Sequence, residues 1–300
     1  MYRMAIAIAL MFIVCMNSAF AEETDPCDRK VDIMDAYDPA APLQRREAAL
    51  AAMRSSTQCA YHAFSLGQLY RHGPDLPGNL VARDLDRARS LILAYAESGY
   101  INAYADLAEL ELKAGNARDA MKWTQVYLSL LKTYSTQYDS SGGSFDRGGY
   151  NANLLLRADE AWREQKPKVS RSEIGPDMNT YLAGRRKQLA DGIRKIEDAN
   201  KSPGEGENAT FRVKSRANTT CSVQLNKKIR AAYATYLVEV QPSGAISRVV
   251  LENFSPEPEA GERLKKCFNV ESFYPVDSDE PRIARFPVVY GPRYGVRVSR

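Results

Sequence analysis

The stretch "YLVEVQPSGAISRVVLENF", Tyr236 to Phe254, decides the fold of the last third of the chain. Two runs rich in β-branched and aromatic residues flank Pro242-Ser243-Gly244, which is typical of a turn between two strands. Gly244 can adopt the positive φ that a tight turn needs. The stretch therefore predicts a β-hairpin, and it follows about two hundred residues with hardly a strand-like run.

The residues after this hairpin complete the pattern of a small domain. Residues 259–268 have the apolar spacing of a short helix, 272–276 form an extended link, and 282–291 resemble a final strand. The predicted order is β-β-α-β, which gives an antiparallel sheet with a helix on one face.

The preceding part of the chain predicts helices. Apolar residues recur at three- and four-residue steps through 57–134, and Gly73-Pro74, Gly99 and Gly115-Asn116 are natural helix stops. Similar spacing returns at 151–163 and after Pro176, where we expect a long stalk-like helix.

These patterns divide the chain into an α-helical part followed by an α+β part. The predicted organisation is a signal peptide at 1–21, a helical repeat domain at 22–134, a loop with a helical extension at 135–199, a linker at 200–209 and a C-terminal domain at 210–300.

Part of the helical region repeats itself. "FSLGQLYRHG" (64–73) matches "ADLAELELKAG" (105–115), and "ARDLDRA" (82–88) is echoed by "ARDAMKW" (117–123), at offsets typical of helical-pair repeats. These residues resemble Sel-like repeats, a variant of the tetratricopeptide repeat. The resemblance implies a solenoid with a concave protein-binding groove, and a generic helical bundle is the alternative.

The C-terminal pieces resemble the C-terminal domain of TonB and its relatives. The matching pieces are the hairpin quoted above, "GERLKKCFNVESFYPV" (261–276) and "RIARFPVVYG" (282–291). The resemblance implies that a partner peptide adds as a strand to an exposed sheet edge. The implied partner-binding residues are Arg282, Ile283, Ala284, Arg285, Phe286, Val288, Val289 and Tyr290, with Tyr274 and Pro275 as an apolar corner beneath the edge. Pro287 lacks a backbone donor and could equally block pairing.

The N-terminus has the features of a secretory signal. Arg3 precedes the apolar run "MAIAIALMFIVCM", and Ala19 and Ala21 suit cleavage before Glu22. A cleaved signal predicts a periplasmic protein. An uncleaved leader would instead anchor the chain in the inner membrane, because the run approaches the length of a membrane span.

Four cysteines remain after cleavage. An exported chain with Cys27, Cys59, Cys221 and Cys267 predicts two disulfides, and three connectivities are open. The simplest pairing is Cys27–Cys59 and Cys221–Cys267, one bond in each part, whereas free buried thiols are the alternative.

The sequence offers no recognisable catalytic or metal-binding pattern. The two histidines, His62 and His72, lack metal-ligand spacing, and no nucleophile elbow, phosphate loop or dinucleotide fingerprint occurs. Residues 210–300 carry 15 basic and 9 acidic side chains (15 − 9 = +6), without the basic-aromatic stripe typical of nucleic-acid binding. We therefore expect no enzyme, cofactor, metal or nucleic-acid partner.

The expected function is a periplasmic protein-interaction protein that binds other envelope proteins or peptides by strand addition and through the repeat groove. Two alternatives are a membrane-anchored TonB-type energy transducer for outer-membrane import and an envelope hydrolase.

Overall fold

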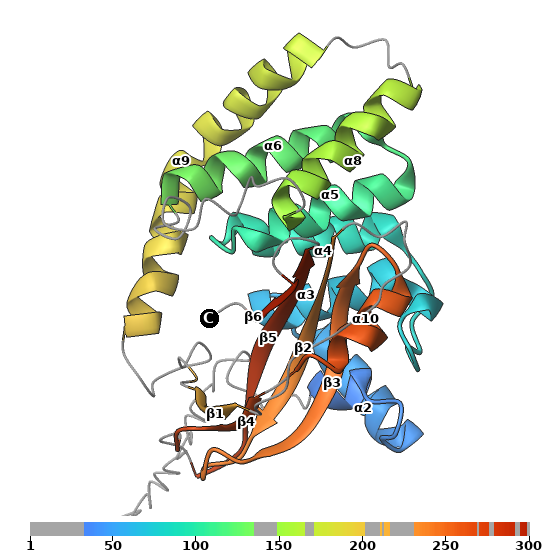
Figure 1. Cartoon of the computed structure of the whole chain (residues 1–300), viewed down its shortest axis with the longest axis vertical. Helices are drawn as coiled ribbons and strands as arrows, with labels where there is room; N and C mark the ends of the chain where they lie inside the picture. Colours follow the sequence, from blue (N-terminus) through green and yellow to red (C-terminus); the bar gives the residue numbers. More distant parts are fainter. Residues whose placement is uncertain are drawn as a thin grey trace, which may run out of the picture.

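The computed structural model describes residues 33–134, 149–165, 171–201, 211, 213–216, 231–268, 270–275, 279–291 and 295–298. The predicted signal peptide, Cys27, Cys221 and nearly all of the predicted linker lie outside this part of the chain. Within it, helices precede antiparallel strands (Figure 1), so the α+β layout is confirmed.

The helices follow one another with short turns. Their bounds are α1 Ile33–Tyr37, α2 Leu43–Ser55, α3 Ala60–His72, the 3-10 turn η1 Gly73–Asp75, α4 Leu85–Glu97, α5 Asn102–Ala114, α6 Ala117–Tyr134, α8 Tyr150–Gln165 and α9 Arg171–Lys201. Gly73, Gly99 and Gly115 all have positive φ, so the predicted helix stops are confirmed.

Helices α3 and α4 pack closely because α3 has a glycine at their contact. A Cβ atom on Gly67 would lie 3.0 Å from Ile92 Cγ1 and 3.2 Å from Leu91 Cβ. The next turn is fixed by Asp84, whose carboxylate caps α4 by accepting a hydrogen bond from the backbone N–H of Arg87 at 3.0 Å.

The prediction of a stalk-like helix is wrong, because α9 packs along other helices. Leu189 and Ile193 are buried, and Tyr181 packs edge-on against Trp123 of α6. Gly192 lies against the backbone of Ser98, where any side chain would collide. The amphipathic pattern of this helix reflects burial against the helical layer.

The strands form one four-stranded sheet and one two-stranded ribbon. Their bounds are β1 Val213–Arg216, β2 Ala232–Val240, β3 Ile246–Ser255, β4 Val270–Phe273, β5 Arg282–Gly291 and β6 Gly295–Val298, with α10 Pro258–Lys265 between β3 and β4. The sheet order is β3-β2-β5-β6, all antiparallel, and β1 pairs with β4.

The predicted hairpin is confirmed as β2 and β3, and the predicted helix and last strand correspond to α10 and β5. Gly244 has φ 84°, and the carbonyl of Phe273 lies where its Cβ would be. Only glycine fits this turn, for both reasons.

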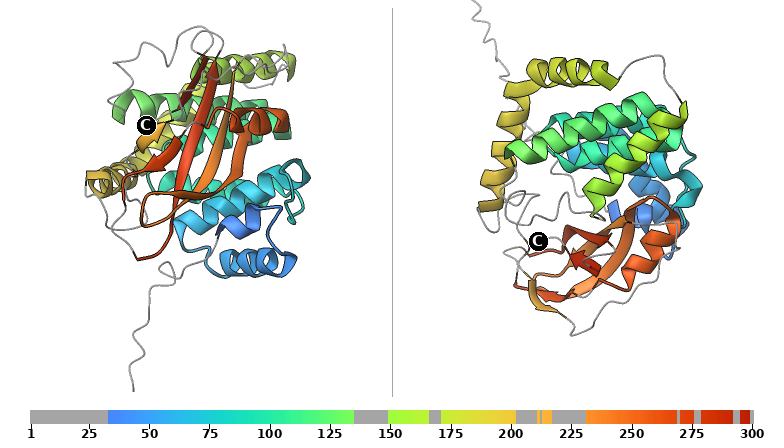
Figure 2. Two further views of the ribbon diagram at one scale, coloured as in Figure 1. Left: turned by 60° about the horizontal axis from the view of Figure 1, so that its bottom comes forward. Right: turned by 45° about the horizontal axis from the view of Figure 1, so that its top comes forward.

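The sheet is covered on both faces. Tyr236 and Phe286 are register partners that both contact Phe268, and the Tyr236 hydroxyl donates to the Gly261 carbonyl in α10 at 2.5 Å. Side chains of opposite parity, such as Tyr233 and Arg285, contact the helical layer. The sheet therefore lies between the N-terminal helices and α10 with its ribbon (Figures 1 and 2).

The predicted C-terminal domain packs against the helices that precede it. Hydrophobic residues of α1, α3, α5 and the strands belong to one continuous core. No helix in the described ranges is long and apolar enough to cross a membrane.

Candidate functional sites: the sheet edge and the helix–sheet interface

Strand β5, the predicted docking edge, is an inner strand over part of its length. It pairs with β2 from Arg282 to Tyr290, and on its other side β6 pairs with Val288 through Gly291. The prediction of an open edge is thus wrong for Val288, Val289 and Tyr290, because the chain's own C-terminal strand occupies that position. Among the described strands, none pairs with Ile283 through Phe286 on the side away from β2.

The side chains of β5 are mostly inside the protein. Ala284, Phe286 and Val288 are buried on the α10 side of the sheet, with Phe286 edge-on to Phe268 at a centroid distance of 5.0 Å. Arg285 points the other way, into the helical layer, where its guanidinium lies 3.7 Å from the ring centroid of Tyr61. A guest at this edge would therefore meet mainly backbone groups.

The predicted apolar corner lies at a different place. Tyr274 is 48% exposed and follows β4, whose Phe273 N–H donates to the Gly244 carbonyl at 2.8 Å. Tyr274 and Pro275 thus lie beside the tip of the β2–β3 hairpin. These residues are exposed, and they lie beside the hairpin turn instead of beneath the β5 edge.

An irregularity in β3 turns two polar residues toward the helices. Thr235 pairs with Asn253 and Tyr236 pairs with Leu251, so Glu252 is an extra residue, a β-bulge. Glu252 is fully buried and Asn253 is 2% exposed. The bulge explains why polarity fails to alternate in "LENFS", residues 251–255.

Polar residues of three helices meet these strands in what we call the helix–sheet interface. It comprises Ser65, Arg71 and His72 of α3, Asp106 and Glu109 of α5, Tyr150 and Arg157 of α8, Tyr233 of β2, Glu252 and Asn253 of β3, and Arg285 of β5.

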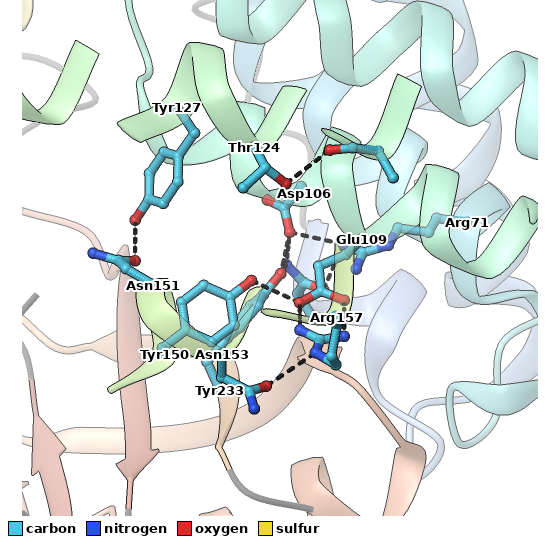
Figure 3. Close-up of polar contacts among 12 residues, drawn as sticks. Arg71, Asp106, Glu109, Thr124, Tyr127, Tyr150, Asn151, Asn153, Arg157 and Tyr233 are labelled. Carbon is cyan, nitrogen blue, oxygen red and sulfur yellow. Dashed lines mark hydrogen bonds and ion pairs between the residues drawn. The ribbon is translucent and has the colours of Figure 1, made fainter. Parts of the chain in front are cut away.

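Asp106 is the acceptor at the centre of this interface (Figure 3). It forms an ion pair with Arg71 at 2.7 Å and accepts a hydrogen bond from the Tyr233 hydroxyl. It also accepts a hydrogen bond from Asn253 Nδ2 at 2.8 Å. Asn253 Oδ1 in turn accepts from Arg71 at 3.2 Å and from His72 Nε2 at 2.8 Å. Most polar groups in this cluster therefore have a partner, as burial requires, and the exception among the described residues is His72 Nδ1, which is buried without one.

A second cluster lies one helical turn further along α5 (Figure 3). Glu109 accepts from Arg157 Nη1 at 2.8 Å and from the Tyr150 hydroxyl at 2.9 Å. Burial is the largest single effect and would raise the pKa of the Glu109 carboxyl, but the charge and hydrogen bonds of Arg157, together with Arg71 and Ser255, outweigh it and the pKa is lowered. Glu109 is thus held as a carboxylate and would not donate a proton.

The third cluster joins α3 to β3 and β5. Arg285 pairs with Glu252 at 2.8 Å, and Ser65 Oγ donates to Glu252 at 2.9 Å while accepting from Arg285 at 2.8 Å. At the rim, Arg248 of β3 pairs with Asp35 of α1 at 2.6 Å.

Sequence reasoning missed this interface entirely, except that it named Arg285 for a different role. A repeat groove in the helical part was expected to bind another protein, whereas the faces of α3 and α5 that carry these polar residues contact the chain's own sheet. One signal was present: buried helical faces with Arg71, Asp106 and Glu109 amid apolar residues are unusual unless partnered.

The described cysteines are both oxidised. Cys59 and Cys267 are each disulfide-bonded. Because Cys27 and Cys221 lie outside the described residues, the pairing within each part stays a prediction.

The carboxylates of this interface are buried and held in ion pairs. Asp106 and Glu109 are each 5% exposed and are paired with arginines. No group of three or more potential metal ligands occurs among the described residues. A cavity of about 520 Å³ lies elsewhere, between α6, α8 and α9, with Met121, Leu155, Ile174 and Met178 in its wall.

Comparison with known proteins gives no guide to this chain, because no family model, curated protein or solved structure matches it.

Proposed function

We propose that this protein is a non-catalytic binding protein of the bacterial periplasm that takes up a partner's peptide as an added strand. The binding position is the part of β5 from Ile283 to Phe286, next to β6. The observation that carries the proposal is that β6 ends its pairing at Val288, so that among the described strands this half of β5 has a ladder partner only in β2.

The chemistry of such a site is backbone pairing. Unpaired N–H and C=O groups on a strand edge are satisfied by an extended guest. Pro287 lies between the residues paired with β6 and the proposed site, and it has no backbone N–H to donate. A guest strand in line with β6 would therefore lack one hydrogen bond at the point where it meets β6. With the side chains of Ala284, Arg285 and Phe286 turned inward, we expect binding to depend little on the guest's sequence.

The two family resemblances belong to the same proposal. In its support, Gly67 lies at the α3–α4 contact where a Sel-like repeat has its tightly packed glycine, and β2, β3, α10 and β5 follow in TonB-like order. The ribbon, β6 and the helical cover are additions to that pattern.

The test of strand addition uses peptides. Random heptapeptides displayed on phage are selected against the full mature chain, and hydrogen exchange is measured with a selected peptide bound. We expect slower exchange at those amides between Ile283 and Phe286 that point away from β2, since alternate amides already bond to β2. Methylating the backbone nitrogens at alternate peptide positions should abolish binding in one alternate set and spare it in the other, since only one set faces the strand. Protection confined to other segments, or equal tolerance of both methylated sets, would contradict strand addition.

The test of location is separate. N-terminal sequencing of the protein recovered from cells is expected to start at Glu22, in the soluble envelope fraction. A protein that begins at Met1 and sediments with membranes would contradict the periplasmic form and favour the anchored transducer.

A further inference from the structure

The buried charges of the helix–sheet interface are paired within their own layer. Arg71 and Asp106 join α3 to α5, and Arg157 and Glu109 join α8 to α5. On the other side, Arg285 and Glu252 join β5 to β3. Separating sheet from helices would break none of these pairs, so neither layer would be left with an isolated charge, which is the most costly result of opening a buried ionic contact.

The contacts that do cross the interface come largely from neutral side chains. Asn253 and Tyr233 donate to Asp106, and Ser65 bonds both Glu252 and Arg285. The ion pairs that cross in the described part of the chain are those of Arg248 with Asp35 and Asp38, where the Arg248 side chain is 20% exposed. Each of these bonds joins a neutral group to a charged one, so when the layers separate water can replace the neutral partner while the charge keeps its ionic partner, although such bonds are stronger than those between two neutral groups.

The apolar part of the interface is aromatic. His72 packs against Phe254 at a centroid distance of 4.1 Å with the rings tilted by 31°, Tyr150 meets Tyr233 edge-on at 4.9 Å, and Arg285 lies over Tyr61. Tyrosine, arginine and phenylalanine are enriched where separate proteins meet. Contacts between domains of one chain resemble such reversible interfaces.

We propose that the helix–sheet interface is a releasable contact, in which the sheet and α10 leave α3, α5 and α8 as a folded unit. The uncovered groove would then bind an extended protein segment of defined chemistry. That segment places a carboxamide between Arg71 and Asp106, as Asn253 does, and a tyrosine hydroxyl on Asp106, as Tyr233 does. The groove is distinct from the β5 edge, and this proposal does not rest on strand addition there.

The first experiment measures thiol accessibility in the full chain with its disulfides intact. Ser65→Cys places a thiol on α3 under the sheet, at a position that is fully buried. Ala96→Cys is the matched control, because Ala96 is equally buried but lies in the core of the helical layer. Both are treated with a maleimide in native buffer, and chemical denaturation gives the unfolding equilibrium of each variant.

Release without unfolding predicts that the thiol at position 65 reacts at least ~10-fold faster than global unfolding allows, whereas the thiol at 96 reacts at the unfolding-limited rate. Adding Asn253→Asp places a second carboxylate beside Asp106 and should speed the reaction at 65 several-fold further without changing that at 96. If both thiols react only at the rate set by global unfolding, the interface is permanent and the proposal is wrong.

A second measurement needs no introduced thiol. The full chain carrying Asn253→Asp is expected to show a larger radius of gyration by small-angle X-ray scattering than the unmodified chain, with unchanged far-ultraviolet circular dichroism. An unchanged radius, or expansion that appears only together with lost secondary structure, would overturn the proposal. The peptide experiment on β5 is unaffected by either result.

The occupant is tested with a synthetic peptide copying residues 248–256, which contains Asn253. It should bind the Asn253→Asp chain at least ~10-fold more tightly than the same peptide with the asparagine replaced by leucine, since the buried partners of the carboxamide would be left unpaired. Equal binding of the two peptides would contradict the proposed chemistry of the groove.

Discussion

Arg71 shows how one side chain can hold two layers together. Its guanidinium, on a side chain that is 3% exposed, donates to Asp106 at 2.7 Å, to Gln68 at 3.1 Å and to Asn253 at 3.2 Å. Arginine suits this position because it stays charged when buried and its Nη1 group lies within reach of all three acceptors. The residue therefore orders α3, α5 and β3 around one charge.

Replacing Arg71 by methionine should lower the free energy of unfolding by about 3–5 kcal/mol, because Asp106 would remain as a buried charge without its cation. Urea denaturation measures this loss. The matched control is Arg194→Ala in α9, whose pair with Asp191 is exposed and should contribute less than about 1 kcal/mol. Equal losses of unfolding free energy in the two variants would show that water reaches Asp106 in the folded protein, which would contradict its burial.

His72 should make stability depend on pH. Burial, and after it the positive charge of Arg71, hold the pKa of His72 well below its ordinary value of 6.5. Below about pH 6.5 the unfolded chain takes up a proton here and the folded protein does not, so the free energy of unfolding should fall by up to about 1.4 kcal/mol per pH unit. Above that pH His72 is neutral in both the folded and the unfolded chain, so it no longer makes the free energy of unfolding depend on pH.

His72→Gln should flatten the stability profile between about pH 6.5 and pH 5, measured by urea denaturation at each pH. His62→Gln is the comparison, because burial and then Arg285 also lower the pKa of His62, though less strongly. A profile with the same slope after the His72 change would mean that this residue is protonated in the folded protein.

At the scale of elements, α9 offers two glycines in opposite surroundings. A Cβ on Gly184 would meet no atom within 4 Å, whereas one on Gly192 would collide with the carbonyl of Ser98. The first position gains helix propensity from alanine without a steric penalty. The second requires α9 to move away from the α4–α5 turn.

We expect Gly184→Ala to raise the free energy of unfolding by about 0.5–1 kcal/mol and Gly192→Ala to lower it by about 1–3 kcal/mol. Denaturation midpoints in urea give both values. Because the substitution and the helix are the same, the difference reports packing alone. If alanine raised the free energy of unfolding at both positions, α9 would not be packed at Gly192, and the predicted stalk-like helix would be favoured again.

The sequence predicted those elements whose signals are local. The β2–β3 hairpin, α10 and β5 follow from strand-like runs, a turn glycine and a helical period, all within about sixty residues. β6 could not be predicted because its partner, β5, decides whether so short a segment pairs. Likewise, the bulge at Glu252 appears in the sequence only as a break in the alternation of polar and apolar residues. Its cause becomes clear only from the helices that Glu252 and Asn253 contact.

The candidate site was harder to predict for a related reason. Whether a strand lies at an exposed edge depends on the whole sheet. Arg282 to Gly291 were correctly predicted to form a strand, but the strands on either side of it were not predicted correctly. The interface with the helices joins residues such as Ser65 and Arg285, 220 positions apart. No local pattern marks such a contact.

For the molecule as a whole, the covalent links must be compatible with the movement of its layers. Cys59 precedes α3 in the helical layer, and Cys267 follows α10, which packs on the opposite face of the sheet. Bonds from Cys59 to Cys27 and from Cys267 to Cys221 would each stay within one part. Either cross-pairing would tie the helical part to the C-terminal part and restrict release.

We therefore expect proteolytic mapping without reduction to find Cys27–Cys59 and Cys221–Cys267 in the exported protein. Reduction should then destabilise each part by about 3–4 kcal/mol through the freed loop, while leaving the thiol reactivity ratio between positions 65 and 96 in place. Recovery of a Cys27–Cys267 or Cys59–Cys221 peptide pair would contradict this pairing. In that case the two layers would be covalently joined, and the distance by which they could separate would be limited by the length of the segments between the bonded cysteines and each layer.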